Sequence, residues 1–269
     1  MTQDMADKLV CLALGGPVAR ITLNRPDRHN SLVPELLEEL LSCVDEVSRN
    51  DDIRAVVLQA NGRSFSTGGD VQAFHDQGAD IKGYARSIVG ALNRCLLALM
   101  DCPHPVIGRI HGPVTGGSLG LLLACDLAVM SQKAFIQPYY CEVGFTPDGG
   151  WLAILPDRIG ARQAGEIMLL NRRVTAADAL RLGLVSAVAE DSQIDDWLAE
   201  RIAELTGKCL HILRAPKTAL WTQERRRECA GALDRELNDF IAHIDLPETW
   251  AGMSKFLGLE AKEIRNAGI

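Results

Sequence analysis

Apolar residues along the first 190 positions alternate between short runs rich in β-branched residues and longer stretches with helical spacing. The predicted strands span residues 8–15, 18–24, 53–60 and 105–110. The predicted helices in this part span residues 34–49 and 84–101, and residues 119–131 are predicted to pass from a helix into a strand. Strands that alternate with helices in this way are typical of βαβ units, so we expect an α/β fold with a mostly parallel sheet.

The remainder of the chain shows helical spacing and lacks a second set of strands. The predicted helices in this part span residues 161–170, 175–182, 193–206, 213–228 and 232–257. No internal repeat, low-complexity tract or linker interrupts the chain. We therefore expect one core domain over residues 1–190, followed by a helical C-terminal region over residues 191–269.

The composition restricts the class of function. The 269 residues include 28 Lys or Arg against 35 Asp or Glu, which gives a formal charge of −7. Because binding to nucleic acid needs a basic face, no nucleic-acid partner is expected. No apolar run reaches the ~20 residues of a membrane span, and the N-terminus lacks the pattern of a secretory signal. We therefore expect a soluble, cytoplasmic protein with no membrane partner.

Eight cysteines are spread along the chain, mostly in apolar segments, and no pair has the CxxC spacing. In a small secreted domain this number would suit four disulfides. In a chain of this length it is typical of buried thiols in a reducing compartment. The spacing supports no zinc site, so no metal is expected.

Two glycine-rich loops follow predicted buried strands: residues 66–70 follow the strand at 53–60, and residues 115–120 follow the strand at 105–110. Glycines let a ligand approach the backbone closely, and N–H groups at a helix start carry partial positive charge. Two such loops at one edge of a sheet can direct two N–H donors at a single oxygen, which is an oxyanion hole. The alternative is that each loop only turns the chain, since neither fits the dinucleotide or P-loop patterns.

The second loop also contains Gly-x-Ser-x-Gly, the nucleophile elbow of α/β-hydrolases, with Ser118 at its centre. A hydrolase of that kind needs an acid and then a histidine after the serine. His211 and His243 are the only histidines after Ser118 in the sequence, and both fall in helical patterns where a packing role is more common. An esterase or thioesterase therefore stands as an alternative.

A third candidate is Asp148, which lies between a proline and two glycines just before an apolar stretch. An aspartate in that position commonly caps a helix or closes a turn. The functional interpretation is a carboxylate in an apolar pocket beside Tyr139, Tyr140 and Trp151. Loss of hydration there would raise the pKa of the carboxyl and suit it to proton transfer.

Taken together, these segments resemble the crotonase (enoyl-CoA hydratase/isomerase) superfamily over nearly the whole chain. The segments that carry the resemblance are ITLNRPDRHNSL (21–32), FSTGGDVQAF (65–74), PVIGRIHGPVTGGSLGLLLACDLAVMS (105–131), VGFTPDGG (143–150) and VTAADALRLGLVSAV (174–188). The resemblance implies a crotonase-like spiral of ββα units and a C-terminal helical region used in trimerisation, with a homotrimer or a dimer of trimers as the assembly. It also implies an acyl-CoA thioester substrate, with coenzyme A arriving as part of the substrate and no other cofactor.

The resemblance also implies roles for individual residues. By position, Gly69 and Gly117 would supply the two oxyanion N–H groups. Thr67 and Asp70 would line the path of the adenine and pantetheine, and Arg28 would lie in the loop that approaches the CoA phosphates. Two backbone hydrogen bonds to the thioester oxygen would lower the cost of forming an enolate.

Two departures from the family pattern change the expected reaction. Hydratases of the family place one glutamate three residues after the second oxyanion glycine, and this chain has Gly120 there. They place the other at the position of Tyr140. Both carboxylates hold and activate the water that is added across the double bond, so an efficient simple hydratase is not expected.

Asp148 matches the aspartate that isomerases of the superfamily use alone. One carboxylate suffices to carry a proton between two carbons, so we expect an isomerase that shifts a C=C bond, with Asp148 as the proton shuttle. One alternative is weak hydratase or lyase activity with water held by Asp148 or Glu142, and another is a catalytically silent acyl-CoA-binding subunit. An aryl-CoA dehalogenase would need a histidine where this chain has Asn93.

Overall fold

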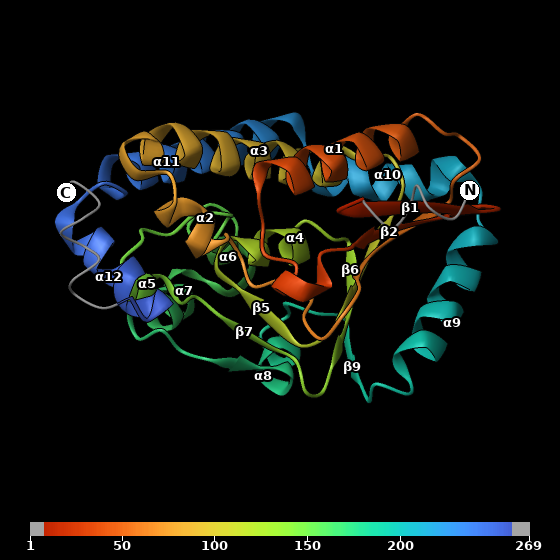
Figure 1. Cartoon of the computed structure of the whole chain (residues 1–269). Helices are drawn as coiled ribbons and strands as arrows, with labels where there is room; N and C mark the ends of the chain where they lie inside the picture. The colour runs from red at the N-terminus through yellow and green to blue at the C-terminus, as the bar shows by residue number, and fades with distance from the viewer. Residues whose placement is uncertain (1–7, 260–269) are drawn as a thin grey trace.

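The computed structural model describes residues 8–259, and its main sheet carries the five strands that the apolar runs predict, together with a sixth at residues 187–189 that they do not (Figure 1). The six strands lie in the order β1-β2-β3-β4-β6-β9. Their bounds are Val10–Gly15 (β1), Val18–Leu23 (β2), Ala55–Ala60 (β3), Val106–Ile110 (β4), Leu127–Ser131 (β6) and Ala187–Ala189 (β9). Only β1 runs antiparallel to its neighbour in this sheet, so the expected mostly parallel sheet is confirmed.

A second sheet, which the apolar pattern does not predict, has the order β5-β7-β8. These strands span Pro113–Thr115 (β5), Phe135–Gln137 (β7) and Val174–Thr175 (β8). Runs of two or three residues are too short to show a strand period in the sequence. This sheet begins directly after β4 and carries the chain into the second glycine-rich loop.

Helices cover both faces of the main sheet. On one face, α1 (Pro34–Ser48) packs against α3 (Ile81–Asp101), and α11 (Gln223–His243) packs against α3, which forms the layer at the top of Figure 1. On the other face, Leu198 of α9 (Ile194–Thr206) packs on strands β3 and β4. Because β3 is covered on both sides, its sequence is a continuous apolar run rather than an alternating one.

The remaining helices are short in the middle of the chain and longer near its end. They are α2 (Val71–His75), α4 (Leu119–Leu123), α5 (Tyr140–Val143), α6 (Leu155–Ile159), α7 (Ala161–Leu169), α8 (Ala176–Arg181), α10 (Leu210–Leu220) and α12 (Pro247–Leu257). Within residues 8–259, no helix is both long enough and apolar enough to cross a bilayer. None of the eight cysteines, all of which the structure describes, forms a disulfide.

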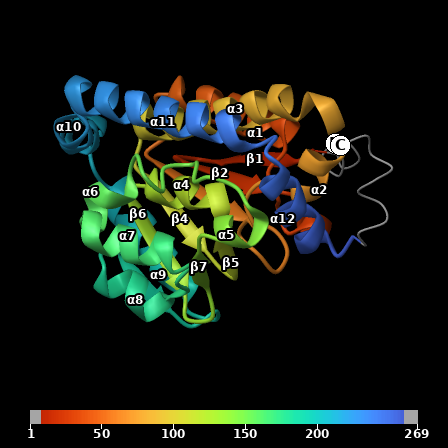
Figure 2. The same cartoon turned by 90° about the vertical axis from the view of Figure 1, so that its left-hand side faces the viewer.

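The two long helices predicted over 213–228 and 232–257 are wrong in their boundaries, because the segment forms three helices. The first break falls at Thr222, whose side chain accepts a hydrogen bond from the Arg225 amide and so caps α11. The second falls at Pro247, which starts α12 as its first residue. Figure 2 shows α12 turned down from α11, where it packs against α2 and α5.

Candidate active site

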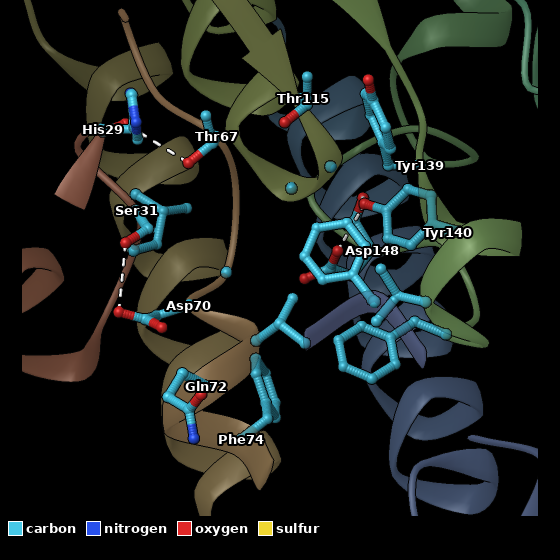
Figure 3. A pocket seen from close by; sticks show the side chains of 18 of the residues that line it. His29, Ser31, Thr67, Asp70, Gln72, Phe74, Thr115, Tyr139, Tyr140 and Asp148 are labelled. Carbon is cyan, nitrogen blue, oxygen red and sulfur yellow. Dashed lines mark hydrogen bonds between the residues drawn. The ribbon is translucent and has the colours of Figure 1, made fainter. Parts of the chain in front are cut away.

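Both glycine-rich loops and Asp148 line one pocket of about 600 Å³ (Figure 3). The first loop enters from β3, the second from β5, and Asp148 from the segment between α5 and α6. The loops touch, since a Cβ added to Gly68 would lie 2.6 Å from the Thr115 carbonyl oxygen. The structure therefore brings Gly69, Gly117 and Asp148 together, as the sequence predicts.

In the first loop, the backbone around Gly69 pairs with Leu32. The Leu32 amide donates to the Gly68 carbonyl, and the Asp70 amide donates to the Leu32 carbonyl. The Gly69 amide donates to neither of these carbonyl groups.

In the second loop, Thr115 and Ser118 form a capping box that uses the Ser118 amide. Gly117 precedes Ser118 in this first turn, where amides have no acceptor within the helix. Gly69 and Gly117 thus border the same pocket with backbone amides of the kind that binds a carbonyl oxygen.

Asp148 is buried and its carboxylate lies against Gly117. A Cβ added to Gly117 would lie 3.1 Å from each carboxylate oxygen. The Tyr140 hydroxyl donates a 2.6 Å hydrogen bond to Oδ1 of Asp148. Burial raises the pKa of Asp148 to about 6, against the lowering effect of that hydrogen bond.

Asp148 does not cap a helix, but it does begin a turn, in which its carbonyl oxygen accepts a 3.5 Å hydrogen bond from the Trp151 amide. Helix α6 begins seven residues later, at Leu155, with Ile154 in the capping position. The residue that follows Asp148, Gly149, has φ +61°, and a Cβ on it would lie 2.5 Å from the Cα of Gly117. Glycine at position 149 therefore lets the Asp148 segment approach the second loop.

Glu236 of α11 is a residue of the site that the sequence analysis missed. Its buried carboxylate accepts hydrogen bonds from the amides of Gly150, Leu152 and Ala153, at 2.6–2.9 Å. Burial raises the pKa of Glu236 to about 7, although these three bonds lower it. Glu236 fixes the turn that follows Asp148, and its sequence signal is a carboxylate on the same helical face as the buried Leu233 and Phe240.

Asp70 lines the pocket, but its carboxylate is engaged by the chain itself. It accepts hydrogen bonds from Arg25 and Arg28 and caps α2 through the Ala73 amide. Burial raises its pKa, yet these partners outweigh burial and hold it below the usual value. Arg28 is half-exposed at the pocket, and Thr67 lines it with a long contact from its hydroxyl to the His29 carbonyl.

The hydrolase alternative is wrong, because Ser118 is not at the pocket. Its side chain is fully buried, and its oxygen lies 2.7 Å from the Thr115 carbonyl and 3.0 Å from that of Ser66. Because this buried hydroxyl hydrogen-bonds to backbone carbonyl groups of both loops, it is not available as a nucleophile. Glu142, the other carboxylate proposed to hold water, is also outside the pocket, where it is exposed and accepts a hydrogen bond from Asn171.

The pocket extends beyond the predicted boundary at residue 190. Phe240 of α11, together with Phe256 and Leu257 at the end of α12, lines it. Phe240 meets Phe74 and Phe145, with ring centroids 5.7 and 5.2 Å away. The C-terminal helices therefore contribute to the pocket of their own chain, and the part of the lining that they form with Phe74 and Phe145 is apolar.

Comparisons with known proteins identify the family to which this sequence is similar. Residues 14–262 fit the family model described as enoyl-CoA hydratase/isomerase. "Probable enoyl-CoA hydratase EchA12" of Mycobacterium tuberculosis is 35% identical over 210 residues, which cover 76% of this chain and 74% of that protein. The human mitochondrial Delta(3,5)-Delta(2,4)-dienoyl-CoA isomerase is 34% identical over 213 residues, which cover 76% of this chain and 65% of that protein.

The fold agrees with these sequence matches. A crystal structure of an enoyl-CoA hydratase from Mycobacterium avium subsp. paratuberculosis superposes with a TM-score of 0.83 at 27% identity, covering 93% of this chain and 96% of that one. One family model thus spans the glycine loops, the Asp148 segment and the C-terminal helices that build the pocket. The chain belongs to the enoyl-CoA hydratase/isomerase family of the crotonase superfamily.

Proposed function

We propose that the protein shifts a C=C bond of an enoyl-CoA, with Asp148 as the proton shuttle and the amides of Gly69 and Gly117 as the oxyanion donors. The observation that carries the proposal is the buried carboxylate of Asp148 against Gly117. Two other aspartates line the pocket, but Asp70 is paired with two arginines and Asp27 is exposed. Asp148 is therefore the pocket carboxylate suited to take a proton from an apolar substrate.

The reaction needs no group from outside the pocket. The carboxylate of Asp148 removes a proton from C2 of a 3-enoyl thioester, and the electron pair of that C–H bond passes to the thioester oxygen to form a dienolate. The protonated Asp148 then returns the same proton to C4, and the double bond forms between C2 and C3. Each oxyanion hydrogen bond stabilises the dienolate, and removal of one such donor costs on the order of 3–4 kcal/mol.

The positions of the hydratase glutamates support isomerisation over hydration. At Gly120, a Cβ would lie 2.4 Å from the Gly149 carbonyl oxygen, so a larger side chain has no room. At the other position, the Tyr140 hydroxyl is bound to Asp148. One carboxylate alone does not provide the pair that holds and activates water. The relatives' names include both reactions, a dienoyl-CoA isomerase and a probable enoyl-CoA hydratase, so the choice rests on the residues at positions 120 and 140.

The other parts of the proposal concern the thioester and the assembly. We propose that Arg28 and Thr67 line the CoA path, with Asp70 keeping Arg28 in place through its hydrogen bonds. Coenzyme A then enters as part of the substrate, without a further cofactor. The helical region from residue 191 is proposed to form a homotrimer or a dimer of trimers, in addition to its part in the pocket.

The test is the variant Asp148→Asn, assayed by the conversion of a 3-enoyl-CoA into the conjugated 2-enoyl-CoA. Turnover is expected to fall by about 10²–10⁴-fold, since the base is lost, while the affinity for acyl-CoA stays nearly unchanged. Asp157→Asn makes the same change at an exposed position of α6 and is expected to keep full turnover. Retained turnover in Asp148→Asn would contradict the proposal.

Two further measurements separate the alternatives. Loss of conjugated absorbance when the protein is given a trans-2-enoyl-CoA would indicate hydration instead. Tight binding of CoA esters without turnover on any enoyl-, dienoyl- or aryl-CoA would indicate a silent binding subunit. Asn93 argues against dehalogenation, because it is buried and donates a hydrogen bond to the Leu233 carbonyl rather than presenting a histidine.

A further inference from the structure

Tyr140 is held in one orientation next to the proposed base. It is the first residue of α5, and the preceding Tyr139 has φ +63°, a left-handed conformation that non-glycine residues rarely adopt. The Tyr140 side chain is buried, and its ring meets Trp151 edge-on. Its hydroxyl points at Asp148 (Figure 3). The buried Trp151 is anchored in turn by a 2.7 Å hydrogen bond from its ring nitrogen to the Gly116 carbonyl.

The contact between Tyr140 and Asp148 distinguishes the two carboxylate oxygens. The hydroxyl lies 2.6 Å from Oδ1 and 3.0 Å from the Asp148 backbone carbonyl. Among the described residues, Tyr140 is the one side chain that donates to this carboxylate, which leaves Oδ2 unheld by any side chain. Both oxygens lie against Gly117, where the substrate carbonyl would bind.

We propose that Tyr140 is a positioning residue, whose hydroxyl holds Oδ1 of Asp148 so that Oδ2 carries the proton, and whose hydrogen bond favours the ionised form of this carboxyl. This inference rests on the proposed isomerase function, because it assigns a role within that site. A hydrogen bond to the charged form of a buried acid favours that form. Tyr140 therefore offsets part of the effect of burial, which favours the protonated form of Asp148.

The surroundings of Asp148 support this assignment. Glu236 of α11 is another buried carboxyl near this site, and its pKa is raised by burial and, to a smaller extent, by the charge of Asp148. Arg25 and Arg28 are bound to Asp70 and do not contact Asp148. Burial and the neighbouring Asp148 raise the pKa of Tyr140 well above its usual value, so the hydroxyl keeps its proton and remains a donor.

The test uses two changes at position 140 and one control. Tyr140→Phe keeps the ring and removes the donor. Incorporation of 3-fluorotyrosine at position 140 keeps the donor and makes it more acidic, which strengthens the bond. Tyr84→Phe is the matched control, because the buried Tyr84 hydroxyl has no hydrogen-bond partner in the described structure and lies outside the pocket lining.

The first readout needs no turnover: the Asp148 carboxyl is titrated by carbon-13 NMR in the ligand-free protein, with its signal assigned by its absence in Asp148→Asn. Tyr140→Phe is expected to raise the pKa by about one pH unit, the size expected for a lost hydrogen bond to a charged group. The fluorotyrosine is expected to lower it, and Tyr84→Phe to leave it unchanged. A change in packing alone would not shift the two variants in opposite directions.

The second readout is the pH dependence of kcat/KM, whose acid limb is expected to move in step with the NMR titration. If Tyr140→Phe does not fold, the fluorotyrosine variant still decides the question. An Asp148 titration that does not move in either variant overturns the role of Tyr140. Full activity in Asp148→Asn, by contrast, overturns the proposed function while the NMR shifts still report the hydrogen bond.

Discussion

At the scale of single residues, the site depends on how the protein surrounds one carboxylate. Asp148 lies between the hydroxyl of Tyr140 and the backbone of Gly117, and burial raises its pKa to about 6. A base with a pKa near neutrality is deprotonated at physiological pH and still binds a proton strongly. The surroundings thus suit an ordinary aspartate to repeated proton transfer.

This pKa predicts the pH dependence of turnover. The base acts in its deprotonated form, so kcat/KM is expected to rise about tenfold per pH unit at acid pH and to level off above pH about 6. The measurement is a pH–rate profile with a 3-enoyl-CoA substrate, accompanied by a check of folding at each pH. An acid limb near pH 4, the value of an exposed aspartate, would contradict a buried base.

A glutamate introduced at Gly120 is not expected to create a hydratase. Its Cβ would meet the Gly149 carbonyl oxygen at 2.4 Å and a methyl of Leu96 at 2.6 Å, so the Asp148 segment would have to move. Gly120→Glu is expected to lose about 1–3 kcal/mol of stability, as overpacked sites do, and to lose isomerase turnover. Denaturant unfolding measures the first effect and the enoyl-CoA assay the second.

Gly165→Glu provides the control for that change. A Cβ at Gly165, within α7, meets no atom within 4 Å, so the same substitution there is expected to leave stability equal or higher. A stable Gly120→Glu variant that hydrates 2-enoyl-CoA would show that the loop can adapt.

At the scale of elements, α11 links the C-terminal region to the base. Glu236 accepts three amide hydrogen bonds from the turn Gly150–Ala153, and the same helix places Phe240 on the pocket wall. The long helix therefore holds both the backbone after Asp148 and part of the apolar lining. A change in α11 is expected to affect catalysis even though its residues lie far along the chain from Asp148.

Glu236→Gln tests this link. The amide group has one acceptor oxygen and would face the turn with a donor, so at least one buried N–H loses its partner. The free energy of unfolding is expected to fall by about 1–3 kcal/mol, and kcat to fall because the Asp148 turn loosens. Glu228→Gln, an exposed position of the same helix, is the control. Unchanged stability and turnover in Glu236→Gln would show that the turn after Asp148 keeps its conformation without the Glu236 carboxylate.

At the scale of the whole molecule, the pocket lies between the glycine loops of the spiral core and the C-terminal helices. Apolar side chains also remain exposed on its outer surface, among them Leu169, Leu170 and Leu220. The proposed homotrimer or dimer of trimers predicts a mass in solution of three or six chains, measured by light scattering after size exclusion. A mass of one chain at every concentration would contradict the proposed assembly.

The sequence predicts much of this architecture because local patterns carry it. The continuous apolar run at β3 predicts a strand covered on both faces, and the spaced leucines of α1 predict a helix with one buried side. The sequence did not predict the second sheet, because its strands are too short to show a period. The sequence also failed to predict the breaks before α11 and α12. Thr222 is compatible with either a helix cap or a polar surface, whereas Pro247 is a local signal for a helix start that the helical spacing of the apolar residues outweighed.

By itself, the sequence determined the first five strands of the main sheet, the two glycine loops and the aspartate before two glycines, because each depends on neighbouring residues. Only the tertiary structure decided that Tyr140 binds Asp148, that Ser118 braces the loops, and that Glu236 holds the turn. It also decided that α11 and α12 close the pocket. Apart from the Tyr140–Asp148 contact, which joins residues eight positions apart, these features are contacts between segments far apart in the chain. None of these contacts leaves a periodic pattern in the sequence that forms it.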